Sequence, residues 1–183
     1  MLHFFKLYPK QTNISILEIG FGTGLNTFIT ALETKKLNKT VQYVGVEAYP
    51  VSKDEYNLLN YAQLISETDT ELFEKMHTTN WEVTSKITSY FYLEKRNQFF
   101  SDIKDEDLYD IIYFDAFGAR VQPELWTEPI FEIMFKALKN RGVLVTYSAK
   151  GSVRRAMQKV GFIVERLPGP PGKREMLRAC KEA

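Results

Sequence analysis

A glycine-rich turn directly after a buried apolar run is the feature that most limits how this chain can fold. The stretch ILEIGFGTGLN covers residues 16–26, and its glycines Gly20, Gly22 and Gly24 are separated by single residues. The apolar run at 14–20 predicts a strand that is buried on both faces. Because glycine lets the backbone come close to a ligand, we expect a ligand to lie against this turn.

The spacing of these glycines argues against the two common phosphate-binding turns. A P-loop needs a lysine after its last glycine, and Leu25 stands there instead. A dinucleotide-binding turn needs G-x-G-x-x-G, but Leu25 or Thr27 occupies the place of the third glycine. The remaining pattern, E-x-G-x-G-x-G with Glu18 inside the strand, resembles the first motif of class I methyltransferases that bind S-adenosylmethionine. A tight turn without a ligand is the alternative.

Strands alternate with helices along the chain. We expect strands at 14–20, 41–47, 81–93, 109–115, 142–148, 162–166 and 175–180, and helices at 25–36, 68–77, 123–138 and 153–160, with a further helix capped by Ser52. The first helix should turn Phe28, Ile29 and Leu32 toward the core. This order predicts a doubly wound α/β fold with a mostly parallel, seven-stranded sheet and an antiparallel last strand.

Two acidic residues end predicted strands, at the sheet edge where such folds bind ligands. Glu47 ends the second strand and can accept hydrogen bonds from both hydroxyls of a ribose; an exposed acid before a helix is the alternative. Asp115 ends the strand YDIIYFD and can hold or deprotonate an amine nucleophile; a loop-capping carboxylate is the alternative. Phe117 and Trp126 could form a wall for a flat base, although aromatic residues at such positions are as often part of the core.

The charge along the chain is polarised although the net charge is only +1. Residues 136–183 carry 12 Lys and Arg against three Glu, and the preceding 135 residues carry 12 bases against 20 acids. This asymmetry favours a polyanionic partner on one side; solvated charges without a partner are the alternative. One cysteine and two histidines predict neither a disulfide nor a metal site. We expect a cytoplasmic protein with no membrane segment.

Longer motifs carry a more specific resemblance. The segments ILEIGFGTGLN, VGVEAYP, YFDAFGARVQPELW, VTYSAKGSVRRAMQKVGF and PGPPGKREMLRA follow one another as in the methyltransferase part of the family of tRNA 5-methylaminomethyl-2-thiouridine biosynthesis. The chain looks like a stand-alone form of that part. The resemblance implies a class I methyltransferase fold, with 1–183 forming a single methyltransferase domain. It also implies methyl transfer from S-adenosylmethionine to the aminomethyl nitrogen of a wobble uridine in tRNA.

The resemblance also implies roles for individual residues. Asp115 would be catalytic, and the cofactor would be bound by Glu18, Gly20, Phe21, Gly22, Gly24 and Glu47. The anticodon stem-loop would contact Phe117, Lys150, Arg154, Arg155, Lys173 and Arg174. We expect neither a flavin nor a metal.

The chain is expected to differ from the family in two respects, and two other functions remain open. The segment that precedes the first strand in the family is expected to be absent here, and the adenine contacts cannot be ranked among Glu94, Asn97 and Asp102. The rival functions are a methyl- or aminopropyltransferase acting on a small amine, and a non-catalytic RNA-binding domain with the same fold. A small cationic amine would gain nothing from the basic C-terminal part, and a binding module has no need of Asp115.

Overall fold

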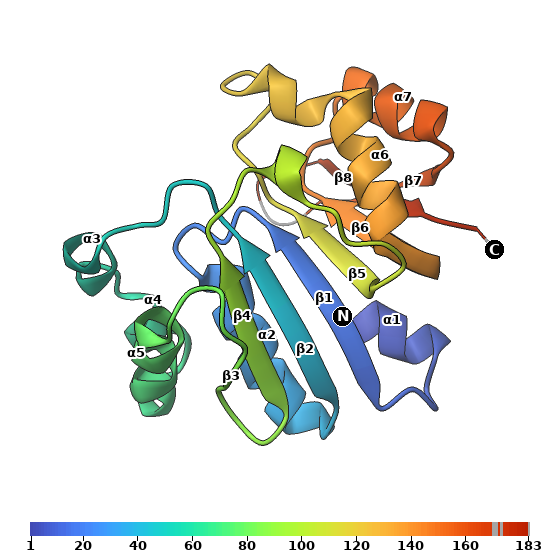
Figure 1. Cartoon of the computed structure of the whole chain (residues 1–183). Helices are drawn as coiled ribbons and strands as arrows, with labels where there is room; N and C mark the ends of the chain where they lie inside the picture. The colour runs from blue at the N-terminus through green and yellow to red at the C-terminus, as the bar shows by residue number, and fades with distance from the viewer. Residues whose placement is uncertain (170–171, 173, 183) are drawn as a thin grey trace.

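The architecture is a single sheet covered by helices on both faces (Figure 1). It was obtained as a computed structural model that describes residues 1–169, 172 and 174–182. The strands are β1 (Asn13–Ile19), β2 (Thr40–Val46), β3 (Ser85–Lys86), β4 (Phe91–Arg96), β5 (Tyr109–Phe114), β6 (Leu138–Thr146), β7 (Ile163–Pro168) and β8 (Glu175–Cys180). The helices are α1 (Leu2–Leu7), α2 (Leu25–Leu37), α3 (Lys53–Asn57), α4 (Tyr61–Ile65), α5 (Thr70–Thr78), α6 (Glu128–Ala137) and α7 (Gly151–Val160).

The strand order explains where a ligand can bind. The order is β3-β4-β2-β1-β5-β6-β8-β7, so the direction of winding reverses between β1 and β5. Strands β4, β2, β1, β5 and β6 are mutually parallel, and β8 pairs antiparallel with both β6 and β7. The carboxyl ends of β1, β2 and β5 therefore meet at one edge, next to the switch point.

The predicted fold class is confirmed, with one more strand than expected. The additional strand is β3, a two-residue segment that pairs antiparallel with the edge strand β4. The strand expected at 81–93 runs instead over Phe91–Arg96, where the exposure of the residues alternates regularly. The antiparallel last strand is confirmed as β8.

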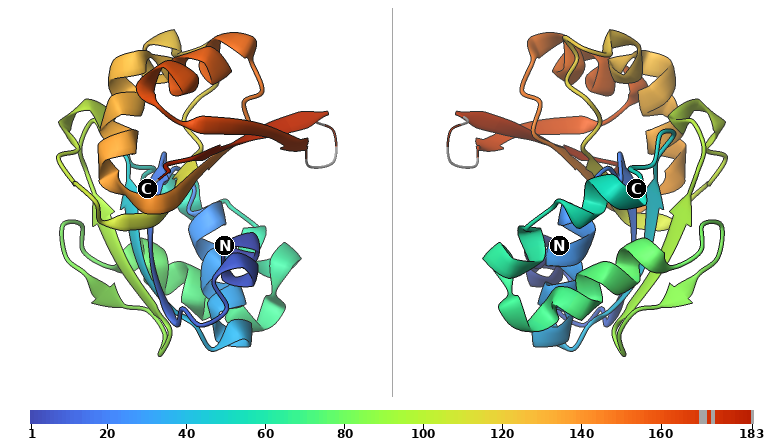
Figure 2. Two further views of the ribbon diagram at one scale, coloured as in Figure 1. Left: turned by 90° about the vertical axis from the view of Figure 1, so that its right-hand side faces the viewer. Right: turned by 90° about the vertical axis from the view of Figure 1, so that its left-hand side faces the viewer.

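Two apolar clusters hold the layers together, one on each face of the sheet. One cluster packs α6 and α7 against the sheet, and the other packs α1, α2, α4 and α5 on the opposite face (Figure 2). Strand β1 contributes side chains to both clusters, because Ile14 and Ile16 point to one face of the sheet while Leu17 and Ile19 point to the other. All four of these side chains are at most 2% exposed, as expected for a central parallel strand.

Several helices differ in detail from the expectation. In α2, Phe28 is fully buried as predicted, but Ile29 is 43% exposed; Thr27, Thr30 and Ala31 take its place in the core. The helix expected at 123–138 is a 3₁₀ turn, η3 (Pro123–Trp126), followed by α6. Thr127 between them is extended, and α6 starts with a proline in its first turn, which favours a new helix start.

The remaining local features are the cap of α3, the N-terminal helix and the absence of a long apolar helix among the described residues. Ser52 caps α3 as predicted and forms a full capping box with Glu55. Helix α1, for which no expectation was formed, buries Phe4 and Phe5 against the sheet. Among the residues described, no helix has the length and apolar character needed to cross a bilayer.

Candidate active site

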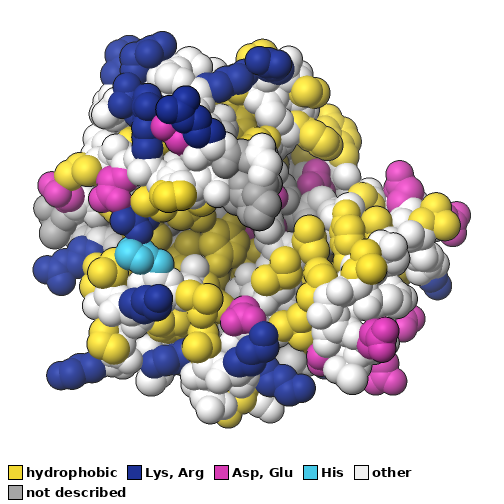
Figure 3. Space-filling model, turned by 180° about the vertical axis from the view of Figure 1, so that it is seen from behind, with side chains coloured by type: hydrophobic (Ala, Val, Ile, Leu, Met, Phe, Trp, Pro, Cys, Tyr) yellow, Lys and Arg dark blue, Asp and Glu magenta, His cyan; other side chains and the backbone are white. Residues whose placement is uncertain are grey.

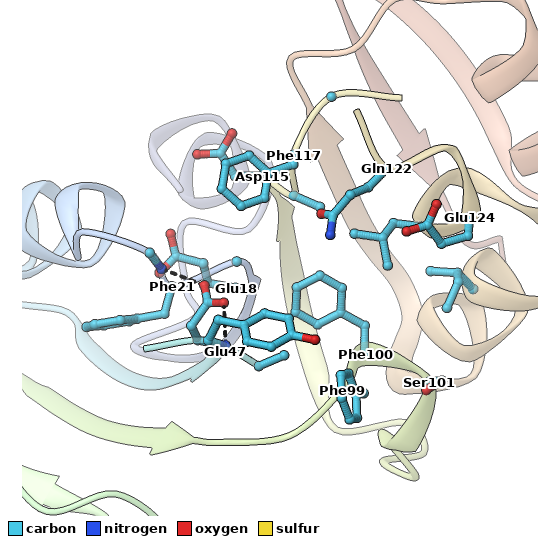
Figure 4. A pocket seen from close by; sticks show the side chains of 18 of the residues that line it. Glu18, Phe21, Glu47, Phe99, Phe100, Ser101, Asp115, Phe117, Gln122 and Glu124 are labelled. Atoms are coloured by element: carbon cyan, nitrogen blue, oxygen red, sulfur yellow. Dashed lines mark hydrogen bonds between the residues drawn. The ribbon is translucent and has the colours of Figure 1, made fainter. Parts of the chain in front are cut away.

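A cavity of about 970 Å³ lies at the carboxyl edge of the sheet, where the sequence placed a ligand. Its walls come from the turn after β1, the end of β2, the loop after β4, the loop after β5 and the end of β6. Figure 4 shows side chains from these separate segments converging on one space. The predicted residues Glu18, Gly20, Phe21, Gly22, Glu47, Asp115 and Phe117 all border it.

Glycine is required in the turn after β1 for two reasons, backbone conformation and space. Gly20 has φ +89°, and a Cβ there would lie 3.0 Å from the carbonyl oxygen of Asp115. Gly24 has φ +73°, and a Cβ there would lie 3.1 Å from Nε2 of His77. Side chains at either position would be strained and would push against fixed neighbours. Gly24 itself is buried and is not among the residues that border the cavity, so its expected contact with the cofactor stays a prediction.

Glu47 fastens the end of β2 to the glycine turn. Its Oε2 accepts a hydrogen bond from the backbone N–H of Gly22 at 3.0 Å, and its Oε1 accepts one from the N–H of Tyr49 at 3.0 Å (Figure 4). Each carboxylate oxygen has a second lone pair, so both can still accept a hydroxyl donor. The carboxylate faces the cavity in an orientation that the backbone fixes.

Glu18 is a buried carboxyl group in the floor of the cavity. Its residue is 1% exposed, and its Oε2 accepts a hydrogen bond from Oγ1 of Thr27 at 2.7 Å. Burial raises the pKa of Glu18 to about 7, opposed by hydrogen bonds from Thr27 and Asn26 and reinforced by the negative charge of Asp115. Glu18 can therefore change its protonation state near neutral pH.

Phe21 supports the turn more than it faces the ligand. Its ring is 4% exposed, and it makes edge contacts with His77 and Trp81 at centroid distances of 5.9 and 6.0 Å. Gly45 in β2 provides the necessary space, because a Cβ there would come within 2.6 Å of the ring. Lys95 braces this layer from below by donating to the carbonyl oxygen of His77 at 2.7 Å. Burial lowers the pKa of His77 to about 4, so this packed layer contains a neutral imidazole at pH 7.

Asp115 stands just past the end of β5 with an exposed side chain that borders the cavity. Its backbone N–H donates to the carbonyl oxygen of Ile19 at 2.9 Å, which fixes its main chain to β1. Its Oδ2 accepts a hydrogen bond from Nδ2 of Asn26 at 2.8 Å. A carboxylate in this place can orient an amine or accept its proton.

The loop after Asp115 is held by two aromatic side chains. The Trp126 ring N–H donates to the carbonyl oxygen of Phe117 at 2.8 Å, and the Tyr147 hydroxyl donates to that of Ala116 at 2.8 Å. Phe117 is 70% exposed at the cavity, but Trp126 is 5% exposed and packs against Phe114. Of the two alternatives considered for Trp126, the structure therefore supports the core position and not the wall for a base.

Sequence reasoning missed the far wall of the cavity. That wall includes Phe99, Phe100, Ser101, Gln122 and Glu124, and Figure 4 shows them across from Glu47 and Asp115. None of the three adenine candidates considered from the sequence is among the residues that border the cavity.

One of those three candidates, Asn97, has a supporting role. Its Nδ2 donates to the carbonyl oxygens of Glu47 and Ala48 at 2.9 and 3.1 Å, so it braces the end of β2. The position of these residues after the edge strand β4 was the available signal, but the strand was predicted several residues too early.

The Lys and Arg residues that were predicted to contact RNA, as far as the structure describes them, lie beside the cavity and do not border it. Lys150 precedes α7 and follows Tyr147, which borders the cavity, by three residues. Arg174 precedes β8, whose start is at the same edge because β8 runs antiparallel to β6. Arg154 and Arg155 lie in the first turns of α7, and Figure 3 shows Lys and Arg side chains gathered at the upper left, at the corner that holds α7. Lys173 lies outside the described residues.

Within the described part of the chain, no three His, Cys, Asp or Glu side chains gather as metal ligands would. The polar side chains that border the cavity carry carboxylate, amide and hydroxyl groups, and several of them are held by hydrogen bonds within the fold.

Comparison with known proteins agrees with this geometry. The chain is 31% identical over 184 aligned residues to the tRNA 5-methylaminomethyl-2-thiouridine biosynthesis bifunctional protein MnmC of Actinobacillus pleuropneumoniae serotype 5b (strain L20), covering 88% of this chain and 26% of that protein. It is 32% identical to the protein of the same name from Campylobacter fetus subsp. fetus (strain 82-40), covering 92% of this chain and 29% of the relative. The chain thus spans little more than a quarter of the length of these relatives.

Solved structures share the fold. MnmC2 from Aquifex aeolicus superposes with a TM-score of 0.68 at 20% identity, covering 96% of this chain and 55% of that one. Spermidine synthase from Thermotoga maritima superposes with a TM-score of 0.59 at 17% identity, covering 93% and 54%. Residues 67–182, which make up more than half of the chain, match the family described as S-adenosyl-L-methionine-dependent methyltransferase. The chain belongs to this S-adenosyl-L-methionine-dependent methyltransferase family.

Proposed function

We propose that this protein transfers a methyl group from S-adenosylmethionine to the amine of a 5-aminomethyl group on the wobble uridine of tRNA, giving 5-methylaminomethyl-(2-thio)uridine. The observation that carries the proposal is the position of Asp115, which borders the same cavity as the glycine turn and Glu47. The names of the curated relatives point to the same modification. We propose in addition that residues 1–183 act as one methyltransferase domain.

The residues of the turn fit the cofactor. Gly20 and Gly22 present backbone without side chains at the cavity, which suits the methionine portion, and Glu47 can accept from the ribose hydroxyls. Glu18 lies in the floor below this portion, where an ionised carboxylate would favour the cofactor's ammonium group. The far wall, with Phe99 and Phe100, offers flat apolar surface for the adenine. When bound, the cofactor supplies an electrophilic methyl group on a sulfonium.

The task left to the protein is to position the amine and manage its proton. The nitrogen must be neutral, because its lone pair forms the new bond to carbon while the carbon–sulfur electron pair stays on sulfur. Asp115 can accept an N–H hydrogen bond that aims the lone pair, and can take the proton that the methylated amine releases. No electron transfer occurs and the electrophile carries its own activation, so we propose that neither a flavin nor a metal takes part.

The surroundings of the cavity favour RNA over a small amine. Phe117 is exposed at the entrance, where an unpaired base can stack, and Lys150 and Arg174 flank the same sheet edge. Basic side chains attract the phosphates of an anticodon stem-loop but repel a polyamine. Likeness to spermidine synthase concerns the fold alone.

The test uses labelled S-adenosylmethionine and tRNA from cells that lack the final methylation, followed by nucleoside analysis. We expect label in the methylaminomethyl uridine with the wild type and none with Asp115→Ala. RNA binding should survive in Asp115→Ala, since the residue is exposed and the substitution removes no basic side chain. Label in a small amine but not in tRNA would replace the proposal by the rival enzyme. Binding of RNA without turnover in the wild type would favour the non-catalytic module.

A further inference from the structure

A side chain from the start of α2, that of Asn26, contacts the proposed catalytic carboxylate of Asp115. Asn26 is the second residue of α2, directly after the glycine turn, and its Nδ2 donates to Oδ2 of Asp115 at 2.8 Å. The two residues are 89 positions apart in the sequence, and both border the cavity. Tertiary structure alone brings them together.

Asn26 is held independently of this contact. Its carbonyl oxygen accepts a hydrogen bond from Oγ1 of Thr30 at 2.7 Å, within the regular helix. The main chain of Asp115 is fixed by its own bond to Ile19 and by the close approach of Gly20. The Asn26 amide, which also hydrogen-bonds Glu18, therefore restricts the rotation of the Asp115 carboxylate.

An amide is well suited to this task. It donates a hydrogen bond without bringing a charge, whereas lysine would neutralise the carboxylate and aspartate would repel it. We propose that Asn26 is the positioning residue that orients Asp115 toward the attacking amine. The inference rests on the proposed function, because it assigns Asn26 a part in the same reaction.

Two substitutions of nearly the same size remove the donated hydrogen bond. Asn26→Leu removes it without adding a charge, and Asn26→Asp replaces it with a second carboxyl group. We expect kcat to fall about 10- to 100-fold in both, the range for a hydrogen bond to a charged group. KM for RNA should change less than about threefold, since the amide does not contact the basic surface. Asn57→Asp, which changes an exposed amide on α3, is the matched control and should behave as the wild type.

The pH dependence separates positioning from packing. In Asn26→Asp, two carboxyl groups face each other at hydrogen-bond distance, so one of them holds a proton to higher pH than an isolated carboxyl. The protonated group can again donate to its neighbour. The activity ratio of Asn26→Asp to Asn26→Leu should therefore rise as the pH falls from about 8 to about 6, because only the aspartate variant regains a donor to Asp115.

The other titratable groups near Asp115 are common to all these proteins. Among the described residues they include Glu18 from β1 and the Tyr147 hydroxyl beyond β6, both of which interact with the charge of Asp115. Asn26 also hydrogen-bonds Glu18, and both Asn26 variants lose that contact, so Asn26→Leu serves as the reference for its effect on Glu18. Measuring S-adenosylhomocysteine binding of each protein at each pH shows whether Glu18 contributes through the cofactor.

The possible outcomes keep the inference distinct from the proposed function. If the wild type methylates tRNA and the kcat of Asn26→Leu lies within about twofold of the wild-type value, the inference is overturned and the proposed function stands. A large loss that is matched by weaker S-adenosylhomocysteine binding, with a flat ratio of Asn26→Asp to Asn26→Leu, would assign Asn26 a structural role and also overturn it. A wild type without any transfer to tRNA would refute the proposed function first.

Discussion

Replacing Glu18 by Gln should stabilise the protein near neutral pH and above. The buried carboxyl accepts a hydrogen bond from Thr27, and Gln can accept the same bond through its amide oxygen. The pKa of Glu18 is raised from 4.5 to about 7 by burial. Above pH 7 the folded protein must therefore hold a charge that the unfolded chain solvates freely, and Gln removes this cost.

The sign and size follow from the two pKa values. Between pH 4.5 and about 7 the folded state binds more protons at this site than the unfolded state, so stability falls as the pH rises through this window. A shift of this size corresponds to about 3 kcal/mol once both states are ionised. The advantage of Glu18→Gln should thus be near zero at about pH 4 and reach about 3 kcal/mol at about pH 8.

Urea unfolding of wild type and Glu18→Gln across this pH range measures the difference directly. Glu132→Gln, at an exposed position on α6, is the control and should show no such trend. The same variant should bind S-adenosylhomocysteine more weakly, because it cannot become negative beneath the cofactor's ammonium group. A stability difference that is independent of pH, or a variant less stable than wild type at about pH 8, would refute the reasoning.

Three further predictions concern the turn, the loop and the basic surface. Gly20→Ala should lower stability by about 1–3 kcal/mol and abolish the thermal shift caused by S-adenosylhomocysteine, because its backbone has φ +89° and its Cβ would press on Asp115. Trp126→Phe keeps an aromatic ring but loses the donor to the Phe117 carbonyl, so we expect a loss of about 1 kcal/mol in urea unfolding together with reduced kcat. Arg155→Ala should weaken RNA binding and reduce the slope of log K against log salt by about one, measured by fluorescence titration; an unchanged slope would remove this residue from the interface.

The sheet could be predicted because its central strands are rich in apolar residues, with few polar interruptions. In β1 and β5, residues bury side chains on both faces, so the signal is dense and its ends are sharp. Strand β4 lies toward the edge and alternates, and the segment before it forms an isolated bridge at Trp81, so its start was placed too early. The two-residue strand β3 has too few residues to carry a periodic pattern.

Within the site, residues that follow strands could be predicted and residues that depend on packing could not. Glu47 and Asp115 end strands at one edge, and chain order suffices to bring them together. The contact of Asn26 with Asp115 depends on how α2 leaves the glycine turn, which sequence spacing does not encode. The opposite fates of Phe117 and Trp126 depend on which side of a short loop meets the core.

Methyl transfer to a synthetic anticodon stem-loop is the most direct test of the proposed function. The stem-loop would carry 5-aminomethyluridine at the wobble position, with a plain-uridine stem-loop and spermidine as comparison substrates, and labelled S-adenosylmethionine as donor. We expect one methyl group per 5-aminomethyluridine, none on either comparison substrate, and loss of transfer with Asp115→Asn, whose side chain has the same shape but cannot take a proton. Transfer that persists in Asp115→Asn, or that goes to spermidine and not to the stem-loop, would contradict this expectation.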